Sequence, residues 1–252
     1  EMTDRKQLLL LNAFAIAAYV ICWIWLGFEL SEQAMFFSAD SNDYLGVAEW
    51  IFNGGETTRT ITRPLLYPTL IGIPYLTFGV TGIWVLHLAC WLVTINLTFL
   101  SVRKWTKNHV AGWIAAAVVI MNLSFIALTF QGLTEVVTTA LLSVLCYHVI
   151  SYSTRFDEAR FGEKLLFILV LLTLVKPSFY CPFLLCLVLI LFAYRKHYRL
   201  APKKLLYPFL IMIPILLQMT VVQVRHDEFS VSTIADLTFK NYYFPQCVRE
   251  IE

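Results

Sequence analysis

The segment "LLLLNAFAIAAYVICWIWLGF", residues 8–28, contains no charged residue. Its length matches the roughly 20 residues that a helix needs to cross the hydrocarbon core of a bilayer. The whole chain of 252 residues is 59% hydrophobic and only 14% charged, with a mean hydropathy of +0.70. Such a chain has too few charged side chains to cover a soluble globule. The sequence therefore predicts an all-α, polytopic integral membrane protein.

Clusters of Lys and Arg between the apolar runs predict the topology. By the positive-inside rule each cluster lies in the cytoplasm, so an even number of crossings separates successive clusters. This gives about seven transmembrane helices, a cytoplasmic amino terminus, a large external loop at 29–82, and an external tail or the start of a further loop at 225–252. The clusters are Arg5 and Lys6; Arg103, Lys104 and Lys107; Arg155, Arg160 and Lys164; and Arg195, Lys196, Arg199, Lys203 and Lys204. The predicted crossings occupy the runs 8–28, 83–102, 108–134, 136–154, 165–194 and 205–224. The run 165–194 forms a hairpin and accounts for two of the seven crossings.

The external loop contains the segment "FSADSNDYLGVAEWIFNGG", residues 37–55. Its apolar residues recur with the period of a helix, and Gly54 and Gly55 are typical of a helix end. We expect an amphipathic helix on the membrane surface, with Asp40 as its N-cap and Asp43 completing a capping box. The later segment 65–79 is short and interrupted by Pro and Gly, which favours an interfacial or re-entrant piece.

Four charged residues fall on the same outer rim in this topology: Asp40, Arg63, Glu135 and Lys176. Ordinary structural interpretations exist for three of them, namely a helix cap, a side chain that reaches the headgroups, and a carboxylate on a helix dipole. Lys176 is harder to explain in this way, because a lysine at membrane depth costs about 2.5–3.5 kcal/mol unless it has a partner or reaches the interface. Two carboxylates and two cations beside an apolar surface suit a reaction on a lipid-linked phosphate. Its leaving group is already a stable anion that cations stabilise, so one carboxylate suffices as the base for the acceptor.

The order of these elements resembles the GT-C superfamily of membrane glycosyltransferases, especially the branch that contains protein O-mannosyltransferases and the lipid A aminoarabinose transferase. The residues that carry the resemblance are Asp40, Tyr44 and Ala48 in "DSNDYLGVAEW", Arg63 in "TRPLLYP", and Glu135 in "LTEVVTTALL". The resemblance implies that residues 1–224 form a GT-C-like transmembrane module. It further implies transfer of a glycosyl group from a polyprenyl-phosphate-linked donor to an acceptor lipid, glycan or protein on the extracytoplasmic face of the membrane.

The resemblance also assigns roles to single residues. Asp40 is the acceptor-activating or metal-associated carboxylate, and Glu135 is a secondary acid. Arg63 is a contact to the phosphate of the donor. Lys176 is added as a second such contact, mainly on physical grounds. No metal ligand is assigned and the cofactor stays open, although Mg²⁺ or Mn²⁺ would find oxygen ligands in Asp40 with Asp43 or Glu135. The full set of substrate-binding candidates is Asp43, Tyr44, Arg63, Tyr67 and Lys176.

The chain departs from the family in two respects. Family members usually continue with more spans and often with an external soluble domain. We therefore expect these 252 residues to be either the amino-terminal portion of a longer protein or a reduced member. In addition, the basic residue of the loop is Arg before a single proline rather than Lys before two, so the sugar is not assigned.

Two other functions fit the same rim charges: a transporter or flippase of a lipid-linked sugar, and a non-catalytic scaffold subunit. A transporter needs polar residues along a path through the bilayer, whereas an isolated polar residue in a span more often hydrogen-bonds a neighbouring helix. Nucleic acid is not an expected partner, because no basic run interleaved with aromatic residues occurs. The mid-span polar candidates are His87, Asn96, Asn122, His148 and Gln218.

Overall fold

The computed structural model describes residues 4–54, 63–152, 159–195, 199, 206–227 and 229–232. All regular structure in these ranges is helical, without a strand. Four of the described helices are long and apolar enough to cross a membrane: α1 (Asp4–Leu26), α5 (Val80–Thr106), α8 (Glu135–Tyr152) and α12 (Leu206–His226). The prediction of an all-α protein with several membrane-spanning helices is confirmed at this level.

Shorter helices complete the described fold. The predicted hairpin at 165–194 does turn, because the helix ends before Lys176 and Pro177 begins a 3-10 turn. The run at 108–134 is broken after Ile120, where the Asn122 side chain caps a new helix by accepting a hydrogen bond from the Phe125 N–H at 3.0 Å. The shorter helices are α2 (Glu32–Met35), α3 (Ala39–Asn53), α4 (Leu66–Phe78), α6 (His109–Ile120), α7 (Leu123–Leu128), α9 (Ala159–Val175), η2 (Pro177–Phe179) and α10 (Tyr180–Ala193).

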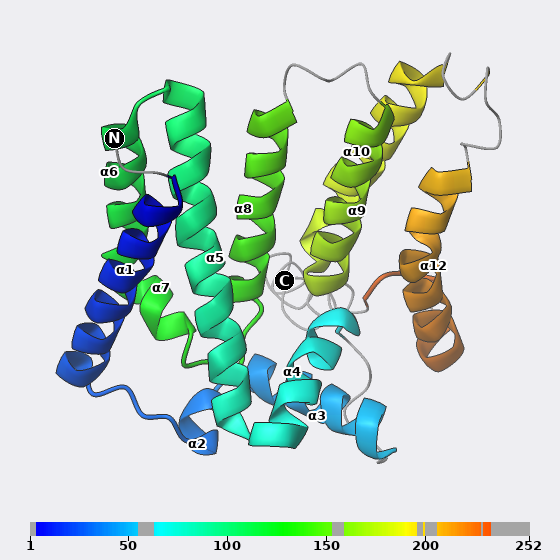
Figure 1. Ribbon diagram of the computed structural model, residues 1–252. Coiled ribbons are helices and arrows are strands. Elements are labelled where there is room, and N and C mark those ends of the chain that lie inside the picture. The colour runs from blue at the N-terminus through cyan, green and yellow to red at the C-terminus, as the bar shows by residue number, and fades with distance from the viewer. Residues whose placement is uncertain are drawn as a thin grey trace, which may run out of the picture.

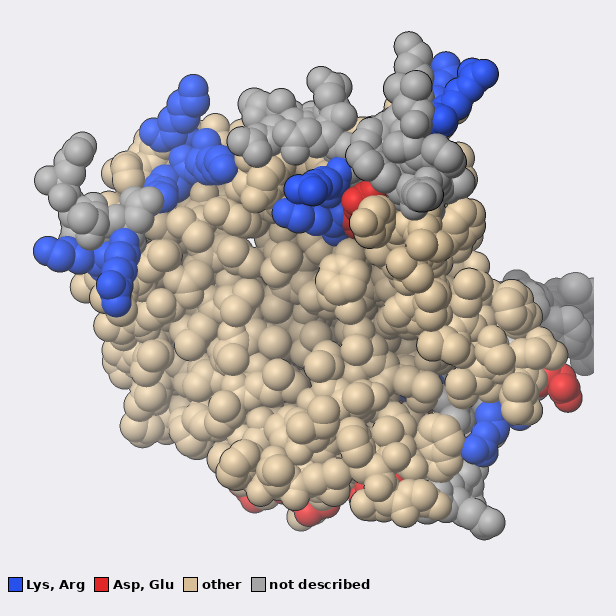
Figure 2. Space-filling view, turned by 45° about the vertical axis from the view of Figure 1, so that its right-hand side comes forward, with Lys and Arg blue, Asp and Glu red and all other residues tan. Residues whose placement is uncertain are grey.

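Charge separates the two ends of the molecule. The long helices lie side by side, and α2, α3 and α4 gather across one end of them (Figure 1). In the space-filling view most Lys and Arg side chains lie along one edge and most Asp and Glu side chains along the opposite edge (Figure 2). We call the end that carries α2, α3 and α4 the acidic end, and the end where α5 finishes and α9 starts the basic end. The acidic end includes Glu32, Asp40, Asp43 and Glu49, and the basic end includes Arg103, Lys104, Arg160 and Lys164.

Buried apolar side chains form three clusters. The first joins α1 to α5, α6 and α7, and the second joins α9, α10 and α12. The third lies at the acidic end, where it packs α2, α3 and α4 against the first turn of α8 and the last residue of α9. Its members are Met35, Phe36, Tyr44, Ala48, Tyr67, Ile71, Ile83, Val137 and Val175. This third cluster is the apolar support of the candidate site.

Helix α4 packs against both α3 and α5. Its 13 residues rise about 20 Å, less than the hydrocarbon core of roughly 30 Å, so α4 is too short to span a membrane alone. The approach to α5 is close, since a Cβ atom at Gly82 would lie 2.2 Å from the backbone oxygen of Pro74. Position 82 therefore accepts only glycine without a shift of one helix away from the other.

The predicted N-cap of α3 is wrong. Ser38, not Asp40, caps the helix: its backbone is extended and its hydroxyl oxygen accepts a hydrogen bond from the Ser41 N–H at 3.1 Å. Asp40 lies in the first turn, so it does not form a capping box with Asp43. The error has a simple cause, because Ser and Asp cap helices about equally well and both occur at this helix start. The predicted helix end is confirmed at Gly54, which has a left-handed φ of 66°, whereas Gly55 lies outside the described residues.

Candidate functional site

Arg63 is the cation at the centre of the first charged group. Its guanidinium forms an ion pair with the Asp40 carboxylate and lies 3.8 Å from the Asp43 carboxylate. The two carboxylates reach the same guanidinium because residues three apart lie on one face of α3. The Arg63 side chain is only 12% exposed, whereas that of Asp40 is 57% exposed. Asp40 is therefore the member of this group that an incoming molecule reaches most easily.

The Tyr44 ring packs against the Arg63 guanidinium of this group. The Arg63 guanidinium carbon lies 5.2 Å from the centre of the Tyr44 ring, a cation–π geometry. Burial raises the pKa of the Tyr44 hydroxyl, while the Arg63 charge and a hydrogen bond from the Thr134 side chain partly oppose that shift. Tyr44 therefore keeps its proton at neutral pH. The same residue contacts Arg63 on one side and, through Thr134, the start of α8 on the other.

Tyr67 lies behind Tyr44 and is fully buried. The two rings meet edge to face, with centroids 4.8 Å apart. The Tyr67 hydroxyl is 3.2 Å from Nε2 of His87, whose Nδ1 is 3.3 Å from the Thr129 carbonyl oxygen. Because a carbonyl only accepts, Nδ1 of His87 is the donor, and Nε2 then accepts from the Tyr67 hydroxyl. Tyr67 thus ties the site to α5 and is not on the surface of the site.

Glu135 and Lys176 form the second charged group. The Lys176 ammonium nitrogen lies 3.2 Å from a Glu135 carboxylate oxygen, and about 40% of each side chain is exposed. Glu135 is the first residue of α8, and Lys176 follows the last residue of α9 with an extended backbone. The packing of α8 on α9 brings these two helix ends together. Lys176 therefore has a carboxylate partner within the described residues.

All seven candidate residues lie at the acidic end of the structure. Tyr44 connects the two charged groups, since it contacts Arg63 and Thr134, the residue before Glu135. Within the part of the chain that the structure describes, three buried polar atoms of this region have no hydrogen-bond partner: Nε of Arg63, Oε2 of Glu135 and Oγ1 of Thr138. Buried polar atoms usually have a hydrogen-bond partner in proteins, and a water, an ion or a ligand is one kind of partner for those that lack one within the chain. The sequence interpretation did not include Thr134 or Thr138, because a threonine beside an acid or one helical turn after it forms no distinctive pattern.

The arrangement has the chemical groups for binding an anion and accepting a proton. An arginine has five N–H donors and a lysine ammonium has three, so the ion pairs of Arg63 with two carboxylates and of Lys176 with one do not use all the donors of either cation. The carboxylates of Asp40 and Glu135 lie beside these cations. Among the described residues, no group of three or more His, Cys, Asp or Glu side chains is placed to hold a metal ion.

The mid-span polar residues are bonded within the protein. Asn96 of α5 donates to the Asn12 side chain of α1 at 2.7 Å, and His148 of α8 lies 3.2 Å from the Phe161 carbonyl oxygen. His87, Asn122 and Gln218 likewise bond protein atoms. The contacts of His87, Asn96 and His148 join two helices, as the sequence interpretation expected, whereas Asn122 caps α7 and Gln218 bonds backbone groups outside the helix interiors.

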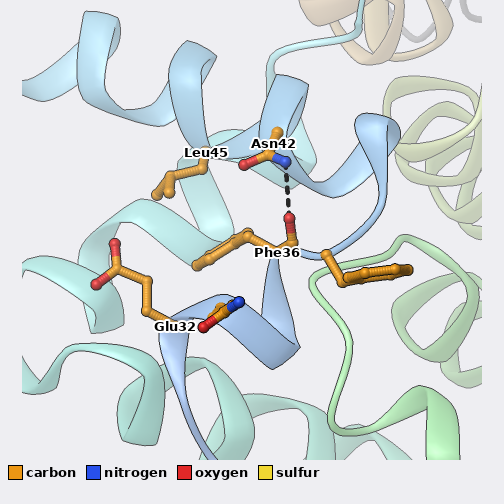
Figure 3. Close-up of a pocket in the computed structure, with 6 residues that line it drawn as sticks. Glu32, Phe36, Asn42 and Leu45 are labelled. Atoms are coloured by element: carbon orange, nitrogen blue, oxygen red, sulfur yellow. Dashed lines mark hydrogen bonds between the residues drawn. The ribbon is translucent and has the colours of Figure 1, made fainter.

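A separate pocket of about 360 Å³ lies where α2 meets α3 (Figure 3). The Asn42 amide donates to the Phe36 carbonyl at 2.7 Å and so fixes the corner between the two helices. At 100° per residue, Asn42 and Leu45 lie on the face of α3 away from Asp40 and Asp43. The pocket is therefore distinct from the charged groups. Its lining residues are Glu32, Gln33, Phe36, Phe37, Asn42 and Leu45.

Comparison with known protein families, curated proteins and solved structures finds no match to this chain, so the resemblance to the GT-C superfamily rests on the residues quoted above.

Proposed function

We propose that the protein is an integral membrane glycosyltransferase that moves a glycosyl group from a polyprenyl-phosphate-linked donor to an acceptor on the extracytoplasmic face. The observation that carries the proposal is the pairing of Asp40 with Arg63 and of Glu135 with Lys176 around Tyr44, at one end of an apolar helical protein. Charges are costly next to hydrocarbon, so their convergence from four separate parts of the chain supports a functional role for them.

The proposed topology has seven crossings, with the amino terminus and the basic end in the cytoplasm. The four long apolar helices supply four crossings. The proposal assigns the other three to α6 with α7, to α9 and to α10. The position of Arg103, Lys104 and Lys164 at the basic end supports this orientation, because Lys and Arg are retained on the cytoplasmic side. The acidic end then faces the extracytoplasmic side.

In the proposed reaction Asp40 accepts the proton of the acceptor hydroxyl or amine. Lys176 and Arg63 contact the phosphate that departs with the polyprenyl chain and stabilise its negative charge. Glu135 holds Lys176 in place as the secondary acid. Asp40 and Lys176 are the more exposed charged residues of the site. Arg63 is largely enclosed by Asp40, Asp43 and Tyr44.

Binding of a polyprenyl phosphate to the purified protein in lipid nanodiscs tests the proposal. A charge-assisted contact to phosphate contributes roughly 1.5–3 kcal/mol, so Lys176→Ala should weaken binding about tenfold or more. Lys104→Ala is the matched control, since Lys104 lies at the basic end, where it donates to the Ser151 carbonyl. Equal affinities for the wild type and Lys176→Ala would refute the assignment of Lys176 to the phosphate.

A further inference from the structure

Gln218 makes an unusual pair of contacts across the fold. It lies within α12 and the residue is only 3% exposed. Its Oε1 accepts a hydrogen bond from the Leu65 backbone N–H at 3.1 Å, and its Nε2 donates to the Val231 carbonyl at 3.1 Å. Both ends of the side-chain amide are therefore bonded to backbone groups outside α12. One of those groups belongs to the segment that carries Arg63.

The bond to Leu65 is the nearest backbone anchor on the carboxyl side of Arg63. Pro64 separates the two residues and has no N–H, so Leu65 offers the first backbone donor after Arg63. The proline ring also fixes the backbone angle φ of Pro64, which lies between them. A shift of Leu65 is therefore expected to move Arg63 as well. Leu65 is the N-cap of α4, and its side chain makes no capping hydrogen bond there. Gln218 thus holds the start of α4 from a different helix.

Helix α12 contacts the other half of the first charged group as well. The Arg225 guanidinium carbon lies 4.9 Å from the centre of the Trp50 ring on α3, the helix that presents Asp40 and Asp43. Leu66 packs into the buried cluster that contains Ile215 and Met219 of α12. One helix near the end of the described chain therefore touches both segments whose charges meet at Arg63.

We propose that Gln218 is a positioning residue, which holds the guanidinium of Arg63 against Asp40 and over Tyr44 by fixing the Leu65 amide. Gln218 is buried, so loss of its side-chain carbonyl oxygen would remove the acceptor of the Leu65 N–H that the structure shows. The consequence for phosphate binding rests on the proposed function. The consequence for the placement of Arg63 does not, and it is measurable without a substrate.

The first test measures the contact between Gln218 and Leu65 and its effect on Arg63. Hydrogen exchange at the Leu65 amide and modification of Arg63 by phenylglyoxal are measured by mass spectrometry in the wild type, Gln218→Met, Gln218→Glu and Gln223→Met. A neutral hydrogen bond corresponds to roughly a fivefold change, so both rates should rise about fivefold in Gln218→Met. Gln218→Glu retains an oxygen acceptor for Leu65 and should restore slow exchange. Gln223, on the same helix at a partly exposed position, is the matched control.

The second test measures the effect of Gln218 on binding of polyprenyl phosphate. Gln218→Met should weaken binding of polyprenyl phosphate about threefold or more, but it should have no further effect when Arg63 is already replaced by Ala. A loss that is equal in both backgrounds would mean that Gln218 acts on stability alone, and would overturn the positioning role. If the wild type does not bind polyprenyl phosphate, the proposed function fails, while the exchange and phenylglyoxal results still decide the role of Gln218.

Two outcomes of the first test would overturn the inference directly. One is an unchanged rate of Arg63 modification in Gln218→Met despite faster exchange at Leu65. The other needs no variant and therefore applies even if Gln218→Met does not fold: a Leu65 amide in the wild type that exchanges as fast as an unprotected backbone amide.

Discussion

Asp40→Asn separates a chemical role of Asp40 from a structural one. Asn keeps the size of the side chain and an oxygen that accepts a hydrogen bond from Arg63, but it has no negative charge and cannot accept a proton at neutral pH. If Asp40 is the base of the proposed reaction, the rate of transfer should fall by about 10²–10⁴-fold, the usual contribution of general acid–base catalysis.

The expected cost in stability is small by comparison. The Asp40 side chain is 57% exposed, so water screens its ion pair with Arg63, which then contributes at most about 1 kcal/mol. Asp40 also lies in the first turn of α3, where a negative charge interacts with the helix dipole by about 0.3–1 kcal/mol. Because Ser38 caps the helix, the cap is unaffected by the substitution. The melting temperature should therefore fall by only a few degrees.

Ser38→Ala provides a control of similar cost in stability. It removes the hydroxyl that accepts from the Ser41 N–H, and loss of an N-cap costs about 1 kcal/mol. The assay is turnover of a polyprenyl-phosphate-linked sugar by purified protein, alongside thermal unfolding of each variant in detergent. We expect Ser38→Ala to keep most of its turnover and Asp40→Asn to lose it. Full turnover in Asp40→Asn, or equal loss in both variants, would refute the reasoning.

Two further predictions concern topology and packing. Reporter domains fused after Lys107 and after Lys204 should read cytoplasmic, and one fused at Phe229 should read external; an external signal after Lys204 would contradict the proposed hairpin of α9 and α10. Gly82→Ala should destabilise the protein by about 1–3 kcal/mol because its Cβ atom would meet the Pro74 backbone oxygen, whereas Gly46→Ala, where the Cβ atom meets nothing within 4 Å, should be neutral or stabilising in thermal unfolding.

The long helices and the turn between α9 and α10 were predictable from the sequence. The apolar runs and their lengths indicate the long helices directly, since a membrane span has few alternatives to a helix. Lys176 with Pro177 inside an apolar run predicted the turn between α9 and α10, because proline disfavours continuation of the first helix. The sequence left open whether Lys176 has a partner or reaches the interface, and its pairing with Glu135 is known only from the structure.

Features that depend on a choice between similar residues were not predictable in this way. The segment at the start of α3 offers several residues able to cap a helix, and the local sequence does not decide between Ser38 and Asp40. The break between α6 and α7 depends on the Asn122 side chain, which serves equally well inside a helix–helix contact. The contact of Gln218 with Leu65 joins positions 153 residues apart, and no local pattern marks either partner.

The two charged groups differ in burial, and this difference decides what each substitution reports. Arg63 is 12% exposed and contacts Asp40, Asp43 and Tyr44, so Arg63→Ala leaves two carboxylates without their cation and removes packing on the Tyr44 ring. A loss of function in that variant would therefore combine loss of the proposed phosphate contact with loss of stability. Lys176 is 41% exposed and its ion pair is screened, so its removal costs little stability. Lys176 is for this reason the residue at which the proposed phosphate contact can be tested separately from folding.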